Sequence, residues 1–218
     1  VSADLGIAFD GDADRMLAVD RHGEFVDGDQ IIGVCALDLH GRGMLVDDTV
    51  VVTVMTNLGF RLGMAAHGVI VHETPVGDRY VLEALQANRW TLGGEQSGHV
   101  IFHELATTGD GLLTAVQLVD VLTRRRGDLA ELAAGAMTRL PQRLRNVRVS
   151  GSAPEIMHAV ADDIAAVSTA LGATGRLLVR PSGTEPLIRV MAEAPTQEAA
   201  DAAVDSLISA LRPFEVSA

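Results

Sequence analysis

Lysine is missing from the sequence, because all 17 basic residues are arginine. This absence excludes a lysine Schiff base, a lysine general base and the lysine of a phosphate-binding P-loop. Cysteine is nearly absent: Cys35 stands alone, so no disulfide framework can form and a cytoplasmic location is expected. Aromatic residues make up only 3% of the chain, which predicts an aliphatic core and few stacking platforms for single-stranded nucleic acid.

Positive charge is also in deficit, since 29 acidic residues against 17 basic ones give a formal net charge of −12. Binding to nucleic acid needs a basic face, so no nucleic-acid partner is expected. No apolar run approaches the roughly 20 residues that cross a bilayer, and Val1 begins no signal-like pattern, so no membrane partner is expected. The 218 residues, 48% of them hydrophobic, fit a globular protein of one or two domains.

Strand and helix patterns alternate over the first two thirds of the chain. Apolar runs predict strands over residues 4–10, 16–19, 50–55, 69–72, 90–92 and 99–105, the first of them buried. Between them, helices are predicted over residues 27–40, 57–67, 78–88, 112–123 and 128–136. This alternation predicts an α/β layer with parallel strand pairing.

The order of predicted strands and helices changes after Pro141. Strands are predicted over residues 143–149, 176–180 and 187–193, and helices over residues 154–171 and 197–211. The resulting β-α-β-β-α order describes a smaller α+β domain. We therefore expect a fold of the α/β class followed by this α+β unit, with a boundary near residues 138–141.

An acidic loop follows the first predicted strand. Asp10, Asp12 and Asp14 stand at alternate positions, with Arg15 beside them. Short carboxylates at this spacing can converge on a hard cation such as Mg²⁺, although a solvated acidic turn is the simpler alternative. A calcium EF-hand is excluded, because its Gly and Glu positions hold Arg15 and Arg21. A phosphatase of the haloacid dehalogenase type fits Asp10 and Asp12 but not Asp14, and it stays an outside alternative.

A second polar segment groups an acceptor, a hydroxyl and an imidazole within five residues. Glu95 and Ser97 are the groups that grip vicinal sugar hydroxyls, and His99 could move a proton near neutral pH. A polar hairpin turn would account for the same residues.

A third polar segment lies between two predicted strands near the C-terminus. Its glycine turn, at Gly183, offers backbone N–H groups to an anion, and Ser182 and Thr184 add hydroxyl donors. Arg180 and Arg189 add positive charge. These groups favour a phosphate site over a plain β-hairpin turn, which is the alternative.

Taken in order, the three segments resemble the α-D-phosphohexomutase superfamily. The matching motifs are Asp-Gly-Asp-Ala-Asp-Arg at 10–15, Gly-Glu-Gln-Ser-Gly-His at 94–99 and Arg-Pro-Ser-Gly-Thr-Glu-Pro at 180–186. Val-Gly-Asp-Arg at 76–79 and Thr-Gly-Asp-Gly at 108–111 extend the resemblance over essentially the whole chain. Within the superfamily, the motifs are most similar to the members that interconvert glucosamine 6-phosphate and glucosamine 1-phosphate through a phosphoserine and a bisphosphate intermediate.

The resemblance implies a role for each matched residue and a hexosamine phosphate as substrate. Asp10, Asp12 and Asp14 would hold Mg²⁺ as cofactor, and the catalytic residues would be Arg15, steadying the phosphoryl group, and His99, transferring a proton. Substrate would be held by Arg79, Glu95, Ser97, Arg180, Ser182, Gly183, Thr184 and Arg189. Residues 1–24 would end the second mutase domain, 25–139 would form the third and 140–218 the fourth.

The sequence departs from the family in one respect that matters for mechanism. The family's phosphoserine loop and the lysine ascribed to its first domain have no counterpart here. We therefore expect a C-terminal half that is inactive alone, with the missing N-terminal half and a possible second copy as protein partners. Two alternatives stay open: a phosphomannomutase or phosphoglucomutase of the same superfamily, and a non-catalytic module that binds sugar phosphate.

Overall fold

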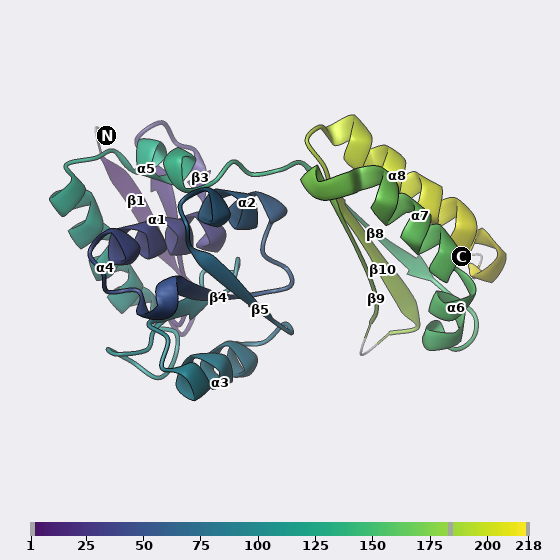
Figure 1. Cartoon of the computed structure of the whole chain (residues 1–218), viewed down its shortest axis with the longest axis horizontal. Coiled ribbons are helices and arrows are strands. Elements are labelled where there is room, and N and C mark those ends of the chain that lie inside the picture. Colours follow the sequence, from purple (N-terminus) through teal and green to yellow (C-terminus); the bar gives the residue numbers. More distant parts are fainter. Residues whose placement is uncertain (1–2, 183–184, 217–218) are drawn as a thin grey trace. The chain divides into compact units, whose positions relative to one another are not determined.

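The computed structural model describes residues 3–182 and 185–216, and the chain divides into two compact units, Val1–Arg139 and Leu140–Ala218 (Figure 1). Each unit combines helices and strands around a hydrophobic core of its own. The mixed α/β class predicted from the sequence is therefore confirmed.

The first unit begins with a small antiparallel sheet. Its strands are β1 (Leu5–Phe9), β2 (Met16–Asp20) and β3 (Phe25–Val26), in the order β1-β2-β3. The prediction that β1 is buried was wrong: it is an edge strand, and Phe9 at its end is 44% exposed. The short β3 was not predicted, because two residues are too few to show a periodic pattern.

The second sheet of this unit is mixed, with the order β5-β4-β6-β7. Its strands are β4 (Thr49–Thr53), β5 (Ile70–Thr74), β6 (Leu92–Gly94) and β7 (Val100–Phe102). As predicted, β4 pairs in parallel with both β5 and β6, whereas β7 closes the edge in the antiparallel sense. Every residue of β4 is buried, as is usual for a β-branched strand at the centre of a parallel sheet.

The helices of this unit alternate with the strands or, as α4 and α5 do, follow the last of them, and aspartate or asparagine caps most of the helices. They are α1 (Gly28–Gly41), the 3₁₀ turn η1 (Val46–Asp48), α2 (Leu58–Ala66), α3 (Asp78–Asn88), α4 (Gly111–Arg125) and α5 (Leu129–Ala136). Side-chain oxygens of Asp27, Asn57, Asp110 and Asp128 accept backbone N–H groups in the first turns of α1, α2, α4 and α5. These caps fix where each helix starts, and therefore where the loops before it end.

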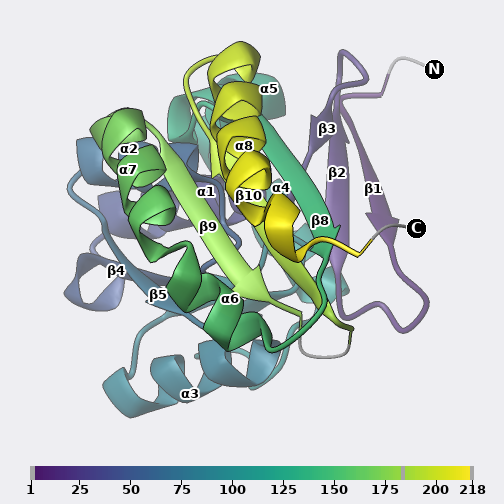
Figure 2. The ribbon, with the colours of Figure 1, turned by 90° about the vertical axis from the view of Figure 1, so that its right-hand side faces the viewer.

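The second unit is an antiparallel sheet with helices on one face (Figure 2). Its elements are β8 (Gln142–Arg148), α6 (Ala153–Ala159), α7 (Ala161–Leu171), η2 (Gly172–Thr174), β9 (Arg176–Pro181), β10 (Leu187–Glu193), α8 (Gln197–Leu211) and η3 (Arg212–Phe214). The strand order is β8-β10-β9, and Ile188, Val190 and Leu207 are fully buried in the core between sheet and helices.

One helix of this unit differs from its prediction. The single helix expected over residues 154–171 is broken at Val160 into α6 and α7, which are bent by 63°. Val160 is buried at the bend, and neither Pro nor Gly marks the position in the sequence. Within the described residues no single helix is long and apolar enough to cross a membrane, although α6 and α7 pass that test as a bent pair.

Candidate active site

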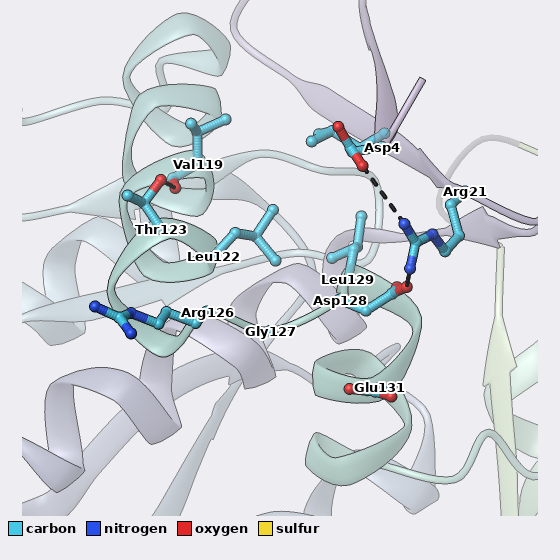
Figure 3. Close-up of a pocket in the computed structure, with 11 residues that line it drawn as sticks. Asp4, Arg21, Val119, Leu122, Thr123, Arg126, Gly127, Asp128, Leu129 and Glu131 are labelled. Carbon is cyan, nitrogen blue, oxygen red and sulfur yellow. Dashed lines mark hydrogen bonds and ion pairs between the residues drawn. The ribbon is translucent and has the colours of Figure 1, made fainter. Parts of the chain in front are cut away.

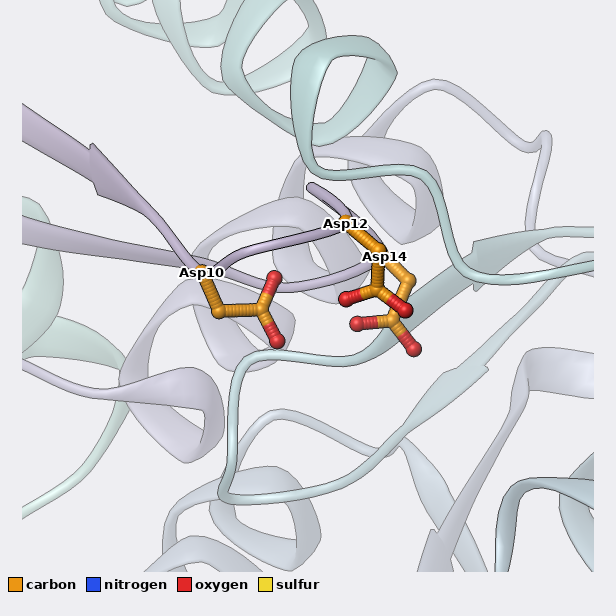
Figure 4. A group of neighbouring side chains, drawn as sticks. All are labelled: Asp10, Asp12 and Asp14. Carbon is orange, nitrogen blue, oxygen red and sulfur yellow. The ribbon is translucent and has the colours of Figure 1, made fainter.

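The loop between β1 and β2 brings three carboxylates together, as the sequence predicted (Figure 4). One oxygen each of Asp10, Asp12 and Asp14 lies within 4.8 Å of the others. The loop turns tightly because Ala13 takes the left-handed conformation, with φ of 57°, and its N–H donates to the Asp10 carbonyl at 3.2 Å. A non-glycine residue in this conformation is strained, so the surrounding contacts must hold the turn in place.

This donor set fits magnesium. Mg²⁺ binds oxygen ligands, and in proteins a few carboxylates usually fill some of its coordination positions while other oxygens fill the rest. These three carboxylates lie partly open to solvent, so other oxygen ligands can reach the same ion. The Arg15 guanidinium lies at the rim, with Nε 3.8 Å from Asp10 and 3.7 Å from Asp14. One half-exposed arginine does not neutralise three carboxylates, so a divalent cation would relieve their mutual repulsion.

The second polar segment, residues 94–99, lies directly against this acidic loop; we call it the sugar loop, after the role that the family resemblance implies. The Met16 N–H donates to the Gly98 carbonyl at 3.0 Å, which joins β2 to the segment between β6 and β7. His99 is buried, with Nδ1 3.1 Å from Asp14 and Nε2 3.1 Å from the backbone nitrogen of Gly109. Residues more than 80 positions apart in the sequence thus form one cluster.

Glu95 and Ser97 line a hollow of about 430 Å³ in the first unit. Oε1 of Glu95 accepts the Gly77 N–H at 3.1 Å, and its other oxygen lies 3.5 Å from the Ser97 hydroxyl. Leu17 and Phe25 form part of the apolar wall. A volume of this size accommodates a small ligand such as a sugar phosphate.

Sequence analysis missed a polar network in the wall of this hollow. The amide of Gln96 lies 3.4 Å from the carboxylates of Asp27 and Asp29, and Arg139 forms an ion pair with Asp27. The signal was hidden, because an aspartate at the start of a predicted helix is explained by capping alone, and Asp27 does cap α1. The Gln96 side chain therefore holds the loop to the start of α1 as well as lining the hollow.

Arg79, the other residue of this unit expected to bind substrate, lies on the surface of α3. Its Nε donates to Glu83 at 2.7 Å, one turn along the helix, and its side chain is 79% exposed. This hydrogen bond and the charge of Glu83 raise the pKa of the Arg79 guanidinium. In this structure Arg79 is engaged with its own helix.

In the second unit, Arg180 on β9 and Arg189 on β10 are direct partners in the antiparallel register. Nε of Arg189 is buried without a hydrogen-bond partner. Like charges directly opposite each other destabilise a sheet, and an anion between them would remove that penalty. Ser182 follows β9, and its N–H donates to the Leu187 carbonyl at 2.9 Å. Gly183 and Thr184 lie outside the described residues.

A second hollow, of about 500 Å³, contains none of the predicted site residues (Figure 3). Arg21 lies at its edge and pairs with Asp128 at 2.8 Å and with Asp4 at 3.5 Å. The pair with Asp128 joins the turn after β2 to the start of α5, and the pair with Asp4 joins it to the residue before β1. We assign this hollow no ligand.

Two family models match the chain. Phosphoglucomutase/phosphomannomutase, alpha/beta/alpha domain III, covers residues 27–140, and the C-terminal domain of the same family covers residues 144–210. The chain therefore belongs to the phosphoglucomutase/phosphomannomutase family, and the resemblance noted in the sequence is confirmed.

Similar curated proteins carry the name phosphoglucosamine mutase. The one from Frankia alni is 56% identical over 97% of this chain and 46% of its own length. The one from Exiguobacterium sibiricum is 51% identical over 96% of this chain and 47% of its own length. The chain thus spans about half the length of the curated relatives it matches.

Solved structures show the same fold at lower sequence identity. A phosphoglucomutase/phosphomannomutase family protein from Burkholderia thailandensis has a TM-score of 0.77 and 22% identity, over 98% of this chain and 47% of that chain. The Aspergillus fumigatus N-acetylphosphoglucosamine mutase, solved with GlcNAc-6P and magnesium, has a TM-score of 0.73 and 24% identity, over 96% of this chain and 49% of that chain.

Proposed function

We propose that this chain is the C-terminal half of a phosphoglucosamine mutase, which interconverts glucosamine 6-phosphate and glucosamine 1-phosphate. In this proposal residues 1–24 end the second domain, residues 25–139 form the third, and residues 140–218 form the fourth. The phosphoserine comes from an N-terminal half, so the chain alone has no turnover. We also propose a cytoplasmic location.

The observation that carries the proposal is the joining of the acidic loop to the sugar loop. A backbone hydrogen bond from Met16 to Gly98 and the contact of His99 with Asp14 hold them together. A mutase needs a charge-neutralising group beside the sugar that is phosphorylated, because phosphoryl transfer depends mainly on positioning and electrostatic stabilisation. An unrelated acidic turn would not need a sugar-sized hollow in its own unit.

In this proposal Asp10, Asp12 and Asp14 hold Mg²⁺, which would neutralise developing charge on the transferring phosphoryl group. Arg15, at the rim of the loop, steadies the same group through its guanidinium. The Glu95 carboxylate accepts hydrogen bonds from sugar hydroxyls, and the Ser97 hydroxyl donates to them. Both residues therefore orient the ring without taking part in bond breaking.

The second unit supplies the site for the phosphate that is not reacting. Arg180 and Arg189 provide two guanidinium groups on one face of the sheet, and Ser182, Gly183 and Thr184 complete the proposed cradle. Arg79 contributes only if it leaves Glu83. The opposition of two arginines across the strands is the observation that supports this part of the proposal.

The test is calorimetric binding of glucosamine 6-phosphate, glucose 6-phosphate and mannose 6-phosphate to the 218-residue chain. We expect preference for the glucosamine compound, and at least tenfold weaker binding in Glu95→Gln and in Arg189→Met. Glu131→Gln is the control, because Glu131 carries the same charge but lines the other hollow. Preference for the glucose or mannose compound would instead support a phosphoglucomutase or phosphomannomutase, and no binding of any sugar phosphate would refute the proposal.

A second measurement separates the mutase from a non-catalytic binding module. Turnover of glucosamine 6-phosphate should be absent with this chain alone and should appear when the N-terminal half of a close relative is added. Binding without turnover in both conditions would support the binding module.

A further inference from the structure

Gln96 is a residue of the sugar loop to which the proposed function gives no role. It lies between Glu95 and Ser97 in the chain and lines the same hollow of about 430 Å³. Its amide nitrogen, Nε2, lies 3.4 Å from Oδ2 of Asp27 and 3.4 Å from Oδ2 of Asp29. Because the side chain is held in the wall of the hollow, the orientation of its amide decides which groups of a ligand it can bind.

The two carboxylates fix which end of the amide faces them. Oδ2 of Asp27 forms an ion pair with the Arg139 guanidinium, and Oδ2 of Asp29 accepts the Asn57 N–H at 2.9 Å. Both oxygens are therefore acceptors. Only the NH₂ end of the Gln96 amide can donate to them, whereas its carbonyl oxygen would leave acceptors facing one another.

The other end of the amide, Oε1, is consequently the end left for a ligand. Within residues 3–182 and 185–216 no hydrogen bond reaches this oxygen, and the Gln96 side chain is only partly buried. In the preceding residue, Oε2 of Glu95 lies 3.5 Å from the Ser97 hydroxyl, which is long for a hydrogen bond. Two adjacent residues thus offer acceptor oxygens to the hollow, and neither oxygen can donate.

The charges around Gln96 favour a donor that is positively charged. Asp27 and Asp29 contact its amide and Glu95 precedes it, whereas Arg139 is the one cation among the described residues that line the hollow. An ammonium group has only donors and carries a positive charge, and charge-assisted hydrogen bonds are roughly twice as strong as neutral ones. A sugar hydroxyl in the same place would donate without the charge, so the hollow favours an amino substituent.

We propose that Gln96 is a specificity-determining residue: its Oε1, held toward the hollow by Asp27 and Asp29, accepts a hydrogen bond from the protonated amino group of the sugar phosphate. This inference deepens the proposed function and rests on it, because it takes the hollow as the sugar site. Glu95 and Ser97 bind hydroxyl groups, which amino sugars and neutral sugars share. Gln96 binds the group in which they differ.

Gln96→Met removes the acceptor, because methionine has a similar length and volume but ends in a thioether, which accepts hydrogen bonds only weakly. The measurement is calorimetric titration of the 218-residue chain with glucosamine 6-phosphate and with glucose 6-phosphate, at about pH 6.5, where an amino group is protonated. Circular dichroism and melting show whether each variant is folded. Gln86→Met, the same change at an exposed glutamine of α3, is the control.

The readout is the ratio of the two dissociation constants, because a merely structural change weakens the binding of both sugars alike. We expect the wild type and Gln86→Met to bind the glucosamine compound about tenfold more tightly than the glucose compound. Gln96→Met should lose most of this preference, with its affinity for the glucose compound kept within about threefold. Arg139→Gln, which removes the cation from the wall, should raise the preference about twofold or more.

Each contrary result has a distinct meaning. An unchanged ratio in folded Gln96→Met, or an equal loss for both sugars, would overturn the specificity role and leave the proposed function intact. A wild type that does not prefer the glucosamine compound would refute the glucosamine assignment of the proposed function, and one that binds neither compound would refute its sugar site; the specificity role fails with either. If Gln96→Met does not fold, a preference in Arg139→Gln no higher than in the wild type would overturn the proposal.

Discussion

The first residue of α1 should not tolerate a side chain. Gly28 lies against the sugar loop: a Cβ there would be 2.2 Å from the Glu95 carbonyl oxygen and 2.6 Å from the Gly98 nitrogen. Ordinary contacts begin near 3.4 Å, so Gly28→Ala requires the loop or the helix to move by about 1 Å. The backbone atoms of the loop cannot yield as the end of a flexible side chain would.

The expected loss of stability follows from three contributions. Overpacking costs about 1–3 kcal/mol. Moving the loop also weakens the hydrogen bond from the Gly28 N–H to the Gln96 carbonyl, worth about 1 kcal/mol. The higher helix propensity of alanine offsets at most about 1 kcal/mol. We expect Gly28→Ala to lower the free energy of unfolding of the first unit by about 2 kcal/mol, or its Tm by roughly 4–8 °C.

Urea unfolding followed by fluorescence measures this effect, because Trp90 is the single tryptophan and lies in the first unit. The matched control is Gly135→Ala in α5, where an added Cβ meets nothing within 4 Å, so a gain of up to about 1 kcal/mol is expected. Substrate binding by Gly28→Ala should weaken as well, since Glu95 and Ser97 move with the loop. A variant as stable as Gly135→Ala would refute the steric reasoning.

Two further predictions concern the interior of each unit. Burial acts to raise the pKa of Asp38, but hydrogen bonds from Arg124 and Arg42 outweigh it and hold that pKa below its usual value. The stabilisation by this carboxylate is therefore complete above about pH 4 and is lost as pH falls through the lowered pKa. Asp38→Asn should lower the free energy of unfolding, measured in urea titrations, by about 2 kcal/mol at pH 7 and by progressively less below about pH 4. A loss of stability that stays the same down to pH 2 would contradict this prediction. Leu207→Ala leaves a cavity at a fully buried position of the second unit and should lower the free energy of unfolding of that unit, followed by circular dichroism, by about 3 kcal/mol. The unfolding transition reported by Trp90 should stay in place. A shifted Trp90 transition would contradict the independence of the two cores.

Local sequence signals predicted most of the elements of this fold. The bounds of α3, α8 and β10 were predicted to the residue, because apolar periodicity marks all three, and Thr196 also caps α8. The break between α6 and α7 was not predicted, since Val160 bends the chain to reach the core and no helix-breaking residue signals it. The prediction that β1 is buried was wrong, because an apolar run indicates a strand without indicating what covers that strand.

The candidate site shows the same division between local and distant information. The spacing of Asp10, Asp12 and Asp14 predicted their convergence, because all three lie in one short loop. The contact of His99 with Asp14 joins residues 85 positions apart, and its acceptor bond from Gly109 depends on a further segment. The periodicity of a single sequence carries no information on contacts between distant segments. Sequence analysis therefore predicted the site residues but not their hydrogen-bond partners.

The main-chain hydrogen bond from Met16 to Gly98 has a consequence for how such sites can be altered. It fixes the acidic loop and the sugar loop to each other through main-chain atoms, so side-chain substitutions elsewhere in the loops leave the attachment in place, whereas a Cβ at Gly98 itself would lie 2.3 Å from the Met16 carbonyl oxygen. Insertions or deletions in either loop would shift both together. Under the proposed function, sugar preference can be redesigned by replacing side chains at constant loop length. A sugar loop grafted from a relative with a different length would need the matching acidic loop grafted with it.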